Sequence, residues 1–216
     1  MLSHPTIDRL RELGLTGMIR ALEEQRRQPD SDQLGFEDRL ALLVDREVLE
    51  RDNKRLKARL RFAGLRQIAA PEDVDYRAHR GLDRALFLRL AQGEWIERQQ
   101  NLLITGPTGV GKTWLACALG QRACRDNRSV LYQRVPRMLE GLGLARGDGR
   151  YARVLKSLAR VQVLILDDWG LAPLTAEQRR DLLEIIDDRH GRASTVVTSQ
   201  LPIENWHAHI GDSKLS

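Results

Sequence analysis

Residues 106–113 read Gly-Pro-Thr-Gly-Val-Gly-Lys-Thr, and this stretch decides the fold of the 216-residue chain. It matches the phosphate-binding pattern G-x-x-x-x-G-K-[ST] at every fixed position. The short apolar run 101–105 before it is typical of a buried strand, and residues 114–119 after it begin a helix. A strand, a glycine-rich loop and a helix in this order predict a site for a nucleoside triphosphate.

The residue types in this loop suit the chemistry of a triphosphate. Glycines let successive backbone N–H groups converge on one anion, and the next helix adds the positive end of its dipole. Lys112 is expected to contact the β- and γ-phosphates, and the Thr113 hydroxyl to bind Mg²⁺. The cofactors are therefore predicted to be ATP and Mg²⁺. The predicted nucleotide-binding residues are Gly106, Pro107, Thr108, Gly109, Val110, Gly111, Lys112, Thr113 and Trp114.

A second apolar run, residues 161–166, ends in two aspartates. It is rich in β-branched residues and too short for a helix, which predicts a central parallel strand. Carboxylates at the C-terminal end of such a strand lie at the edge of the sheet where ligands bind. Asp167 is therefore predicted to bind Mg²⁺ together with Thr113, and Asp168 to orient or deprotonate the attacking water.

A later strand, residues 194–199, ends in the polar residues Thr198, Ser199 and Gln200. If this strand inserts beside the strand before the phosphate loop, these side chains face the γ-phosphate. The alternative is an ordinary strand that ends in a turn.

The remaining pattern divides the chain into three segments. Residues 1–66 are predicted to be all-helical, with Thr6 and Thr16 capping the first two helices, and residues 67–93 to be a linker and one helix. From residue 94 strands and helices alternate, which predicts an α/β fold with a parallel sheet flanked by helices. The expected strands are 101–105, 129–133, 161–167 and 194–199, and the expected helices include 111–126 and 175–190. A capping box is predicted at Thr175 and Gln178, and a mobile loop at 141–151 because it contains four glycines.

Composition narrows the class of protein. Hydrophobic residues make up 42% of the chain, yet no apolar stretch approaches the length of a membrane span, and no signal peptide is visible. The two cysteines are expected to be buried thiols. These features predict a cytoplasmic protein with no membrane partner.

The positive charge is concentrated in two regions. Residues 51–66 contain seven basic residues against one acidic residue, and a second basic region lies between residues 134 and 160. Such blocks are typical of nucleic-acid contact, although a solvated helix face is the alternative. Few aromatic residues accompany the charges, so phosphate contact with duplex DNA is favoured over stacking on single strands. The candidate DNA-binding residues are Lys54, Arg55, Lys57, Arg59, Arg61, Arg146, Arg150 and Arg153.

Taken in order, the phosphate loop, Leu-Asp-Asp-Trp-Gly at 166–170 and Val-Thr-Ser-Gln-Leu-Pro at 197–202 resemble AAA+ ATPases of the helicase-loader branch. Arg-Val-Pro-Arg at 134–137 and Trp-His at 206–207 make the resemblance closest to IstB, the helper ATPase of bacterial insertion-sequence transposition. The resemblance implies a sheet in the order 5-1-4-3-2 after a small helical DNA-binding domain at 1–66, with the ATPase core at 94–216. It also implies a catalytic, γ-phosphate-sensing role for Gln200, beside Lys112 and Asp168.

The resemblance ends at Gly211-Asp212, four residues before the last residue, Ser216. Family members continue with a last strand, a helical lid and arginines that act on ATP. Without them we expect an incomplete core, nucleotide binding that exceeds hydrolysis, and an uncovered edge of the phosphate-loop strand that favours self-association.

Three functions fit these observations. The leading hypothesis is an ATP-dependent helper of transposition, which forms an oligomer or filament on duplex DNA and recruits or stimulates a transposase. A replicative helicase loader would use the same catalytic residues with another partner. A nucleotide-gated scaffold would bind ATP and DNA with little hydrolysis.

Overall fold

The computed structural model describes residues 5–28, 33–78 and 81–206, which group into two compact units, Met1–Ala58 and Arg59–Ser216. The helix α3 (Phe36–Ala63) is continuous across this division. The last turns of α3 and the segment after it therefore belong to the second unit, whereas the sequence placed the boundary at residue 66. The predicted end of the family resemblance, residues 211–216, lies outside the described residues.

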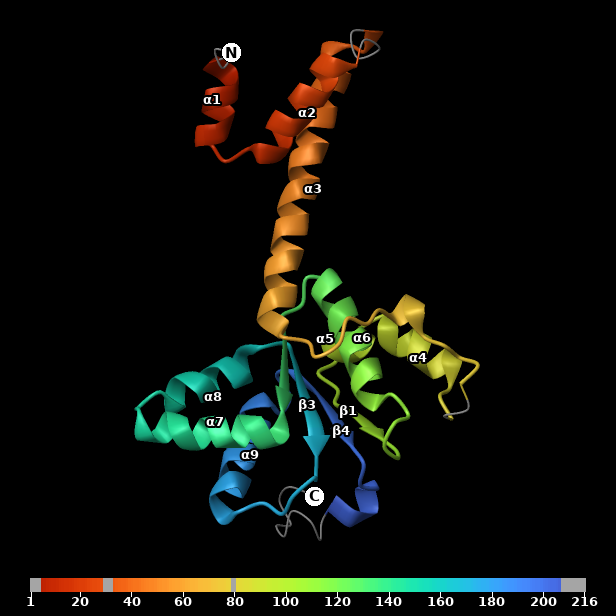
Figure 1. Cartoon of the computed structure of the whole chain (residues 1–216), viewed down its shortest axis with the longest axis vertical. Coiled ribbons are helices and arrows are strands. Elements are labelled where there is room, and N and C mark those ends of the chain that lie inside the picture. Colours follow the sequence, from red (N-terminus) through yellow and green to blue (C-terminus); the bar gives the residue numbers. More distant parts are fainter. Residues whose placement is uncertain (1–4, 29–32, 79–80, 207–216) are drawn as a thin grey trace. The chain divides into compact units, whose positions relative to one another are not determined.

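The first unit is helical, as predicted. It contains α1 (Pro5–Glu12), α2 (Thr16–Arg27) and the greater part of α3 (Figure 1). The predicted caps are wrong: α1 already begins at Pro5, and the residue before α2 is Leu15, which makes no side-chain cap.

Glu47 of α3 replaces the predicted cap of α2. Its Oε2 accepts hydrogen bonds from the backbone N–H of Gly17 at 2.7 Å and of Met18 at 3.2 Å. The two helices approach so closely here that a Cβ on Gly17 would lie 2.6 Å from the Cα of Glu47. A carboxylate from another helix thus satisfies the free donors at the start of α2.

This contact makes the first unit sensitive to acid. The Arg51 side chain, followed by the N–H groups of Met18 and Gly17, holds the pKa of Glu47 below its usual value of 4.5. A carboxylate with a lowered pKa stabilises the fold above its ordinary pKa, and that stability is lost as pH falls through the folded pKa. We expect Glu47→Gln to lower the unfolding midpoint at about pH 7, with a smaller difference from wild type at about pH 3. Circular dichroism melts at both pH values test this, and equal midpoints at neutral pH would contradict it.

The second unit is built around a parallel sheet of β1 (Leu102–Thr105), β2 (Val130–Arg134), β3 (Val163–Trp169) and β4 (Ser194–Ser199). Its α-helices are α4 (Arg84–Ala91), α5 (Glu94–Glu97), α6 (Lys112–Arg125), α7 (Val135–Gly147), α8 (Tyr151–Arg160) and α9 (Ala176–Arg189). Short 3₁₀ turns occupy Pro71–Asp73 and Ile203–Asn205. Within the described residues, no helix combines the length and apolar character needed to cross a bilayer.

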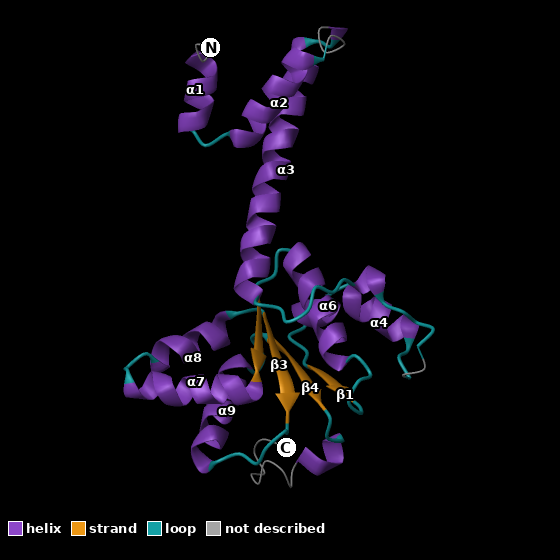
Figure 2. Ribbon diagram, viewed as in Figure 1, coloured by secondary structure: helices purple, strands orange, loops and turns teal. Residues whose placement is uncertain are grey.

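The strand order is β1-β4-β3-β2 with every pair parallel. This is the 1-4-3-2 part of the implied order, and β4 lies beside the phosphate-loop strand as predicted. Figure 2 shows helices on both sides of the sheet. Alternating strand residues explain the two layers: Leu164 and Leu166 pack with α7, α8 and α9, while Ile165 approaches Gly120 of α6.

One predicted loop is a helix. The glycine-rich stretch 141–151 was expected to be mobile, but α7 continues to Gly147. Leu139, Leu142 and Ala145 are buried at helical spacing, so packing against the sheet outweighs the low helix propensity of glycine. Gly141 and Gly143 face open space. The capping box at Thr175 and Gln178 is present as predicted.

Candidate nucleotide-binding site

A cavity of about 280 Å³ lies where the phosphate loop meets the C-terminal ends of β3 and β4. This is the edge of a parallel sheet at which ligands bind. Its lining residues are Gln67, Thr108, Gly109, Gly111, Lys112, Thr113, Trp114, Asp168, Thr198, Ser199 and Gln200. The structure thus brings together most of the residues predicted for the nucleotide site. Gly106, Pro107 and Val110 belong to the same loop without lining the cavity, and Asp167 lies behind it.

The loop folds around the Lys112 side chain. Gly109 and Gly111 have φ values of 87° and 91°, a region that residues with a Cβ seldom adopt, and Gly111 is the N-cap of α6. The Lys112 ammonium donates to the carbonyls of Gly106 at 2.7 Å and Pro107 at 2.8 Å. Burial lowers the pKa of Lys112, while Asp167 and Asp168 act in the opposite direction. A cation and the start of a helix therefore meet in one concave loop, which suits a polyphosphate.

Asp167 is fully buried and surrounded by hydroxyl groups. Its Oδ1 accepts hydrogen bonds from Thr113 at 2.8 Å and from Thr198, and its Oδ2 accepts one from Tyr132 at 2.5 Å. The two residues predicted to hold Mg²⁺ are therefore in direct contact. A carboxylate and a hydroxyl are hard oxygen ligands, which fit Mg²⁺ when substrate phosphates and waters complete its coordination. Within the described part of the chain, no three His, Cys, Asp or Glu side chains form a cluster able to hold a metal unaided.

Asp168 lies in an irregular part of β3. Its φ is +62°, and the pairing of β3 with β4 changes register between Leu166 and Trp169. In a regular strand adjacent side chains point to opposite faces, whereas a bulge can turn both to one site. Oδ2 of the Asp168 carboxylate accepts a hydrogen bond from Nε of Arg134 at 2.7 Å and forms an ion pair with its Nη2, also at 2.7 Å. Sequence reasoning missed this partner, because it assigned Arg134 to a basic surface.

The end of β4 connects the loop to both aspartates. The Thr108 hydroxyl donates to Oε1 of Gln200 at 2.8 Å, and Oγ1 of Thr198 accepts from the Asp168 N–H at 3.2 Å. Gln200 therefore lies over the cavity, where the sequence expected a γ-phosphate sensor. Gln67 and Tyr132 were also missed, since neither belongs to the loop or to the Asp-Asp pair.

The candidate DNA-binding residues differ in how far their charges are already engaged. Arg59 donates to the Cys124 carbonyl at 2.9 Å, and Arg150 pairs with Asp148. Arg146 contacts both Asp181 and Glu177 and stacks on Tyr151. Arg153 lies in the electrostatic field of Asp148, and the Arg55–Asp52 pair, at 3.6 Å, is exposed. By contrast, Lys54, Lys57 and Arg61 have exposed side chains and no ion pair or hydrogen bond within the described residues.

Together, the sheet order and the loop define an ATP-binding protein of the AAA+ P-loop class. Two solved structures share the fold: the DnaC helicase loader, with a TM-score of 0.61 at 22% identity over 68% of this chain and 89% of that one, and DnaI, with a TM-score of 0.58 at 25% identity over 66% and 77%.

The sequence comparisons give the family. Residues 8–216 match the family of IstB-like ATP binding proteins, and the chain belongs to it. An insertion sequence ATP-binding protein of Sinorhizobium fredii is 60% identical over 98% of this chain and 86% of its own length. Another, from Pseudomonas fluorescens, is 55% identical over 94% of this chain and 88% of its own length.

Proposed function

We propose that this chain is an ATP-dependent, DNA-binding helper of insertion-sequence transposition, which assembles on duplex target DNA and recruits or stimulates a transposase. The observation that carries the proposal is the cavity in which Lys112, Thr113 and Asp168 meet beside the buried Asp167. The relatives named for insertion sequences support the biological setting.

In this proposal each residue of the cavity has one task. The loop N–H groups and Lys112 bind the phosphates, and Thr113 and Asp167 hold Mg²⁺, which would neutralise phosphate charge. Asp168 accepts the proton of the attacking water or orients it. Gln200, held by Thr108, contacts the γ-phosphate. Both aspartates lie at the end of one strand, which brings the residue that would hold the metal and the residue that would act on water to the same edge of the sheet.

DNA contact is proposed for one face of α3. Residues 54, 57 and 61 are spaced three and four apart, so their side chains lie along one side of the helix. We call Lys54, Lys57 and Arg61 the α3 basic stripe. Arg55 lies beside it, whereas Arg59 and Arg146 are left out because their guanidinium groups have partners inside the protein.

A charge-removal experiment tests the proposal. Changing all three residues of the α3 basic stripe to Gln is expected to weaken duplex binding about 10²–10³-fold near 0.1 M salt, and to reduce the slope of log affinity against log salt by about 3. Fluorescence anisotropy with labelled duplex in saturating Mg²⁺-ATP measures both quantities.

The matched control removes equal charge elsewhere, by changing the exposed residues Arg89, Arg180 and Arg192 to Gln. This control should bind duplex nearly as the wild type does. Wild-type affinity that does not change between about 50 and 200 mM salt would contradict phosphate contact. Lys112→Ala, which removes a charge-assisted contact, should abolish the part of DNA binding that depends on ATP.

A second candidate is a nucleotide-gated scaffold with little hydrolysis. One observation favours it: Arg134 engages Oδ2 of Asp168 in an ion pair, so one of the two carboxylate oxygens is already occupied and Oδ1 is left to act on water. ATP binding and turnover, measured separately with and without DNA, distinguish the two functions. A replicative helicase loader, the third candidate, would co-purify with a helicase rather than a transposase.

A further inference from the structure

Arg66 lies at the back of the candidate metal site. The sequence placed this residue in the basic block 51–66, yet its Nη1 is 3.8 Å from Oδ2 of Asp167 and 3.8 Å from Oδ2 of Asp168. Arg66 follows the end of α3 by three residues, within the second unit. A cation from outside the phosphate loop and outside the sheet thus approaches both acidic side chains.

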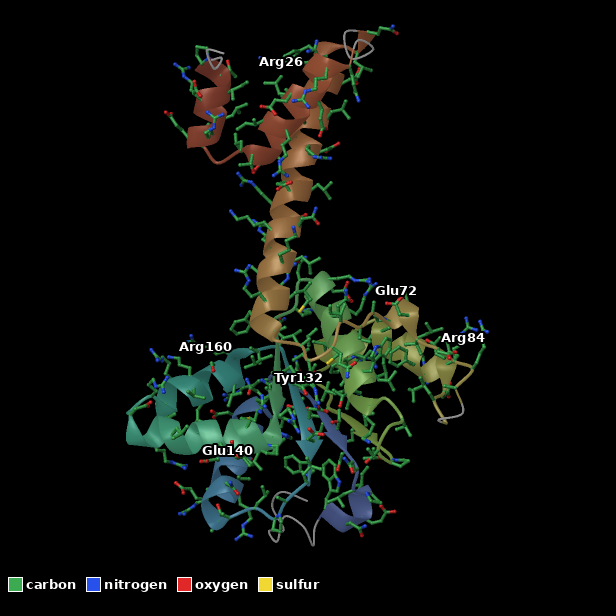
Figure 3. All side chains as sticks on the ribbon, in the orientation of Figure 1. Arg26, Glu72, Arg84, Tyr132, Glu140 and Arg160 are labelled. Carbon is green, nitrogen blue, oxygen red and sulfur yellow. The ribbon has the colours of Figure 1, made fainter. Side chains whose placement is uncertain are left out.

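Tyr132 contacts the same oxygen of the buried carboxylate that Arg66 approaches. Its side chain is buried on β2 (Figure 3), and its hydroxyl donates to Oδ2 of Asp167 at 2.5 Å. The other carboxylate oxygen, Oδ1, accepts from Thr113 and Thr198. The two oxygens of Asp167 therefore have separate surroundings, with Oδ1 facing the phosphate loop and Oδ2 facing Tyr132 and Arg66.

Two groups from outside the phosphate loop therefore face the same oxygen of Asp167. The Tyr132 hydroxyl donates a hydrogen bond to Oδ2, and the Arg66 guanidinium lies 3.8 Å from that oxygen. A hydrogen-bond donor and a cation on Oδ2 fix the orientation of the carboxylate and leave Oδ1 directed at Thr113.

We propose that Arg66 is a positioning residue for the magnesium–nucleotide site, acting together with Tyr132 on Oδ2 of Asp167 to hold Oδ1 toward Thr113 and the metal. The proposal rests on the proposed function, because it assigns Arg66 a role in that same site. Groups that orient a metal-binding carboxylate from behind typically change metal affinity 10–100-fold when they are removed.

Arg59 and Arg66 together connect the end of α3 to the site. Arg59, in the last turns of α3, is tied to the end of α6 through the Cys124 carbonyl. Helix α6 begins with Lys112 and Thr113 of the phosphate loop. The segment from Arg59 to Arg66 is thus attached to the helix of the phosphate loop at one end and approaches the two aspartates at the other.

Nucleotide affinity with and without the metal tests the proposal. A fluorescent ATP analogue is titrated in excess Mg²⁺ and in EDTA, and the ratio of the two affinities is the readout. We expect Tyr132→Phe to lower this ratio about 10-fold or more and Arg66→Gln about 3–10-fold, with the affinity in EDTA unchanged. Arg66→Lys, which keeps the charge, should recover part of the ratio. Arg192→Gln is the matched control, since it removes an exposed arginine just before the start of β4, at the end of that strand away from the site, and should leave the ratio unchanged.

The possible outcomes distinguish a specific loss of metal-dependent binding from general damage to the nucleotide site. They also distinguish failure of this proposal from failure of the proposed function. A wild-type or higher ratio in Arg66→Gln would overturn it, and so would an equal loss of affinity in Mg²⁺ and in EDTA. Tyr132→Phe provides the second variant if Arg66→Gln does not fold. If the wild-type chain binds no labelled nucleotide at all, the proposed function fails and the role of Arg66 fails with it.

Discussion

Asp168→Asn is expected to lower the turnover number for ATP by about 10²–10⁴-fold, while the affinity for Mg²⁺-ATP stays within about threefold of wild type. Asparagine has the same shape as aspartate and tolerates the left-handed backbone at φ +62°. It also leaves the backbone N–H free to bond Thr198. The substitution therefore removes the ability to accept a proton from water, and it replaces the ion pair with Arg134 by a hydrogen bond to a neutral amide oxygen.

Turnover is measured by phosphate release with saturating duplex DNA, and affinity by calorimetry. Asp188→Asn, at an exposed position of α9, is the matched control and should match wild type in both. If Asp168→Asn loses nucleotide binding instead, Asp168 is a metal ligand and the roles of Asp167 and Asp168 are reversed. If turnover is negligible already in the wild type, the scaffold function replaces the hydrolytic one.

The parts of this site that the sequence predicted are encoded locally. The phosphate loop, the buried strand ending in Asp167 and the capping box at Thr175 each depend on residues a few positions apart, and local geometry determines their structure. The place of β4 beside β1 came from the family resemblance, which implied the strand order, since the polar residues at the end of β4 alone left an ordinary strand end as the alternative.

The parts that the sequence missed depend on contacts distant in the chain. Glu47 caps a helix 30 residues earlier, and Arg134 pairs with a carboxylate 34 residues later. A count of charges cannot tell a cation that faces solvent from one that pairs with an aspartate, so Arg66 was counted in the basic block 51–66 and Arg146 was named as a DNA-binding candidate. The helix through 141–147 was missed for a similar reason, since tertiary packing there outweighs the local preference of glycine.

Arg189 is another residue with contacts distant in the chain, and it joins three segments of the second unit. The side chain is 2% exposed and has no carboxylate partner in the described structure. It donates instead to the carbonyls of Leu158 at 2.7 Å, Val161 at 2.8 Å and Ser194 at 2.5 Å, and to the Thr195 hydroxyl at 3.0 Å. Burial lowers the pKa of Arg189 to about 10, so the group stays charged near neutral pH. One guanidinium thus joins the end of α8, the chain entering β3 and the start of β4.

Arg189→Met is therefore expected to destabilise the second unit by about 3–5 kcal/mol. Methionine fills much of the space but donates no hydrogen bond, and each buried acceptor left without a donor costs about 1–3 kcal/mol. Methionine also removes the cost of burying the Arg189 charge without a carboxylate partner, which offsets part of the loss. The net destabilisation is therefore smaller than the sum over the lost hydrogen bonds. The unfolding midpoint should fall by about 10 °C, measured by calorimetry. Arg192→Met, at an exposed position just after α9, is the matched control and should leave the midpoint unchanged. If Arg189→Met had the same unfolding midpoint as the wild type, the four acceptors would have found water or other donors. The guanidinium would then not be the group that joins these three elements.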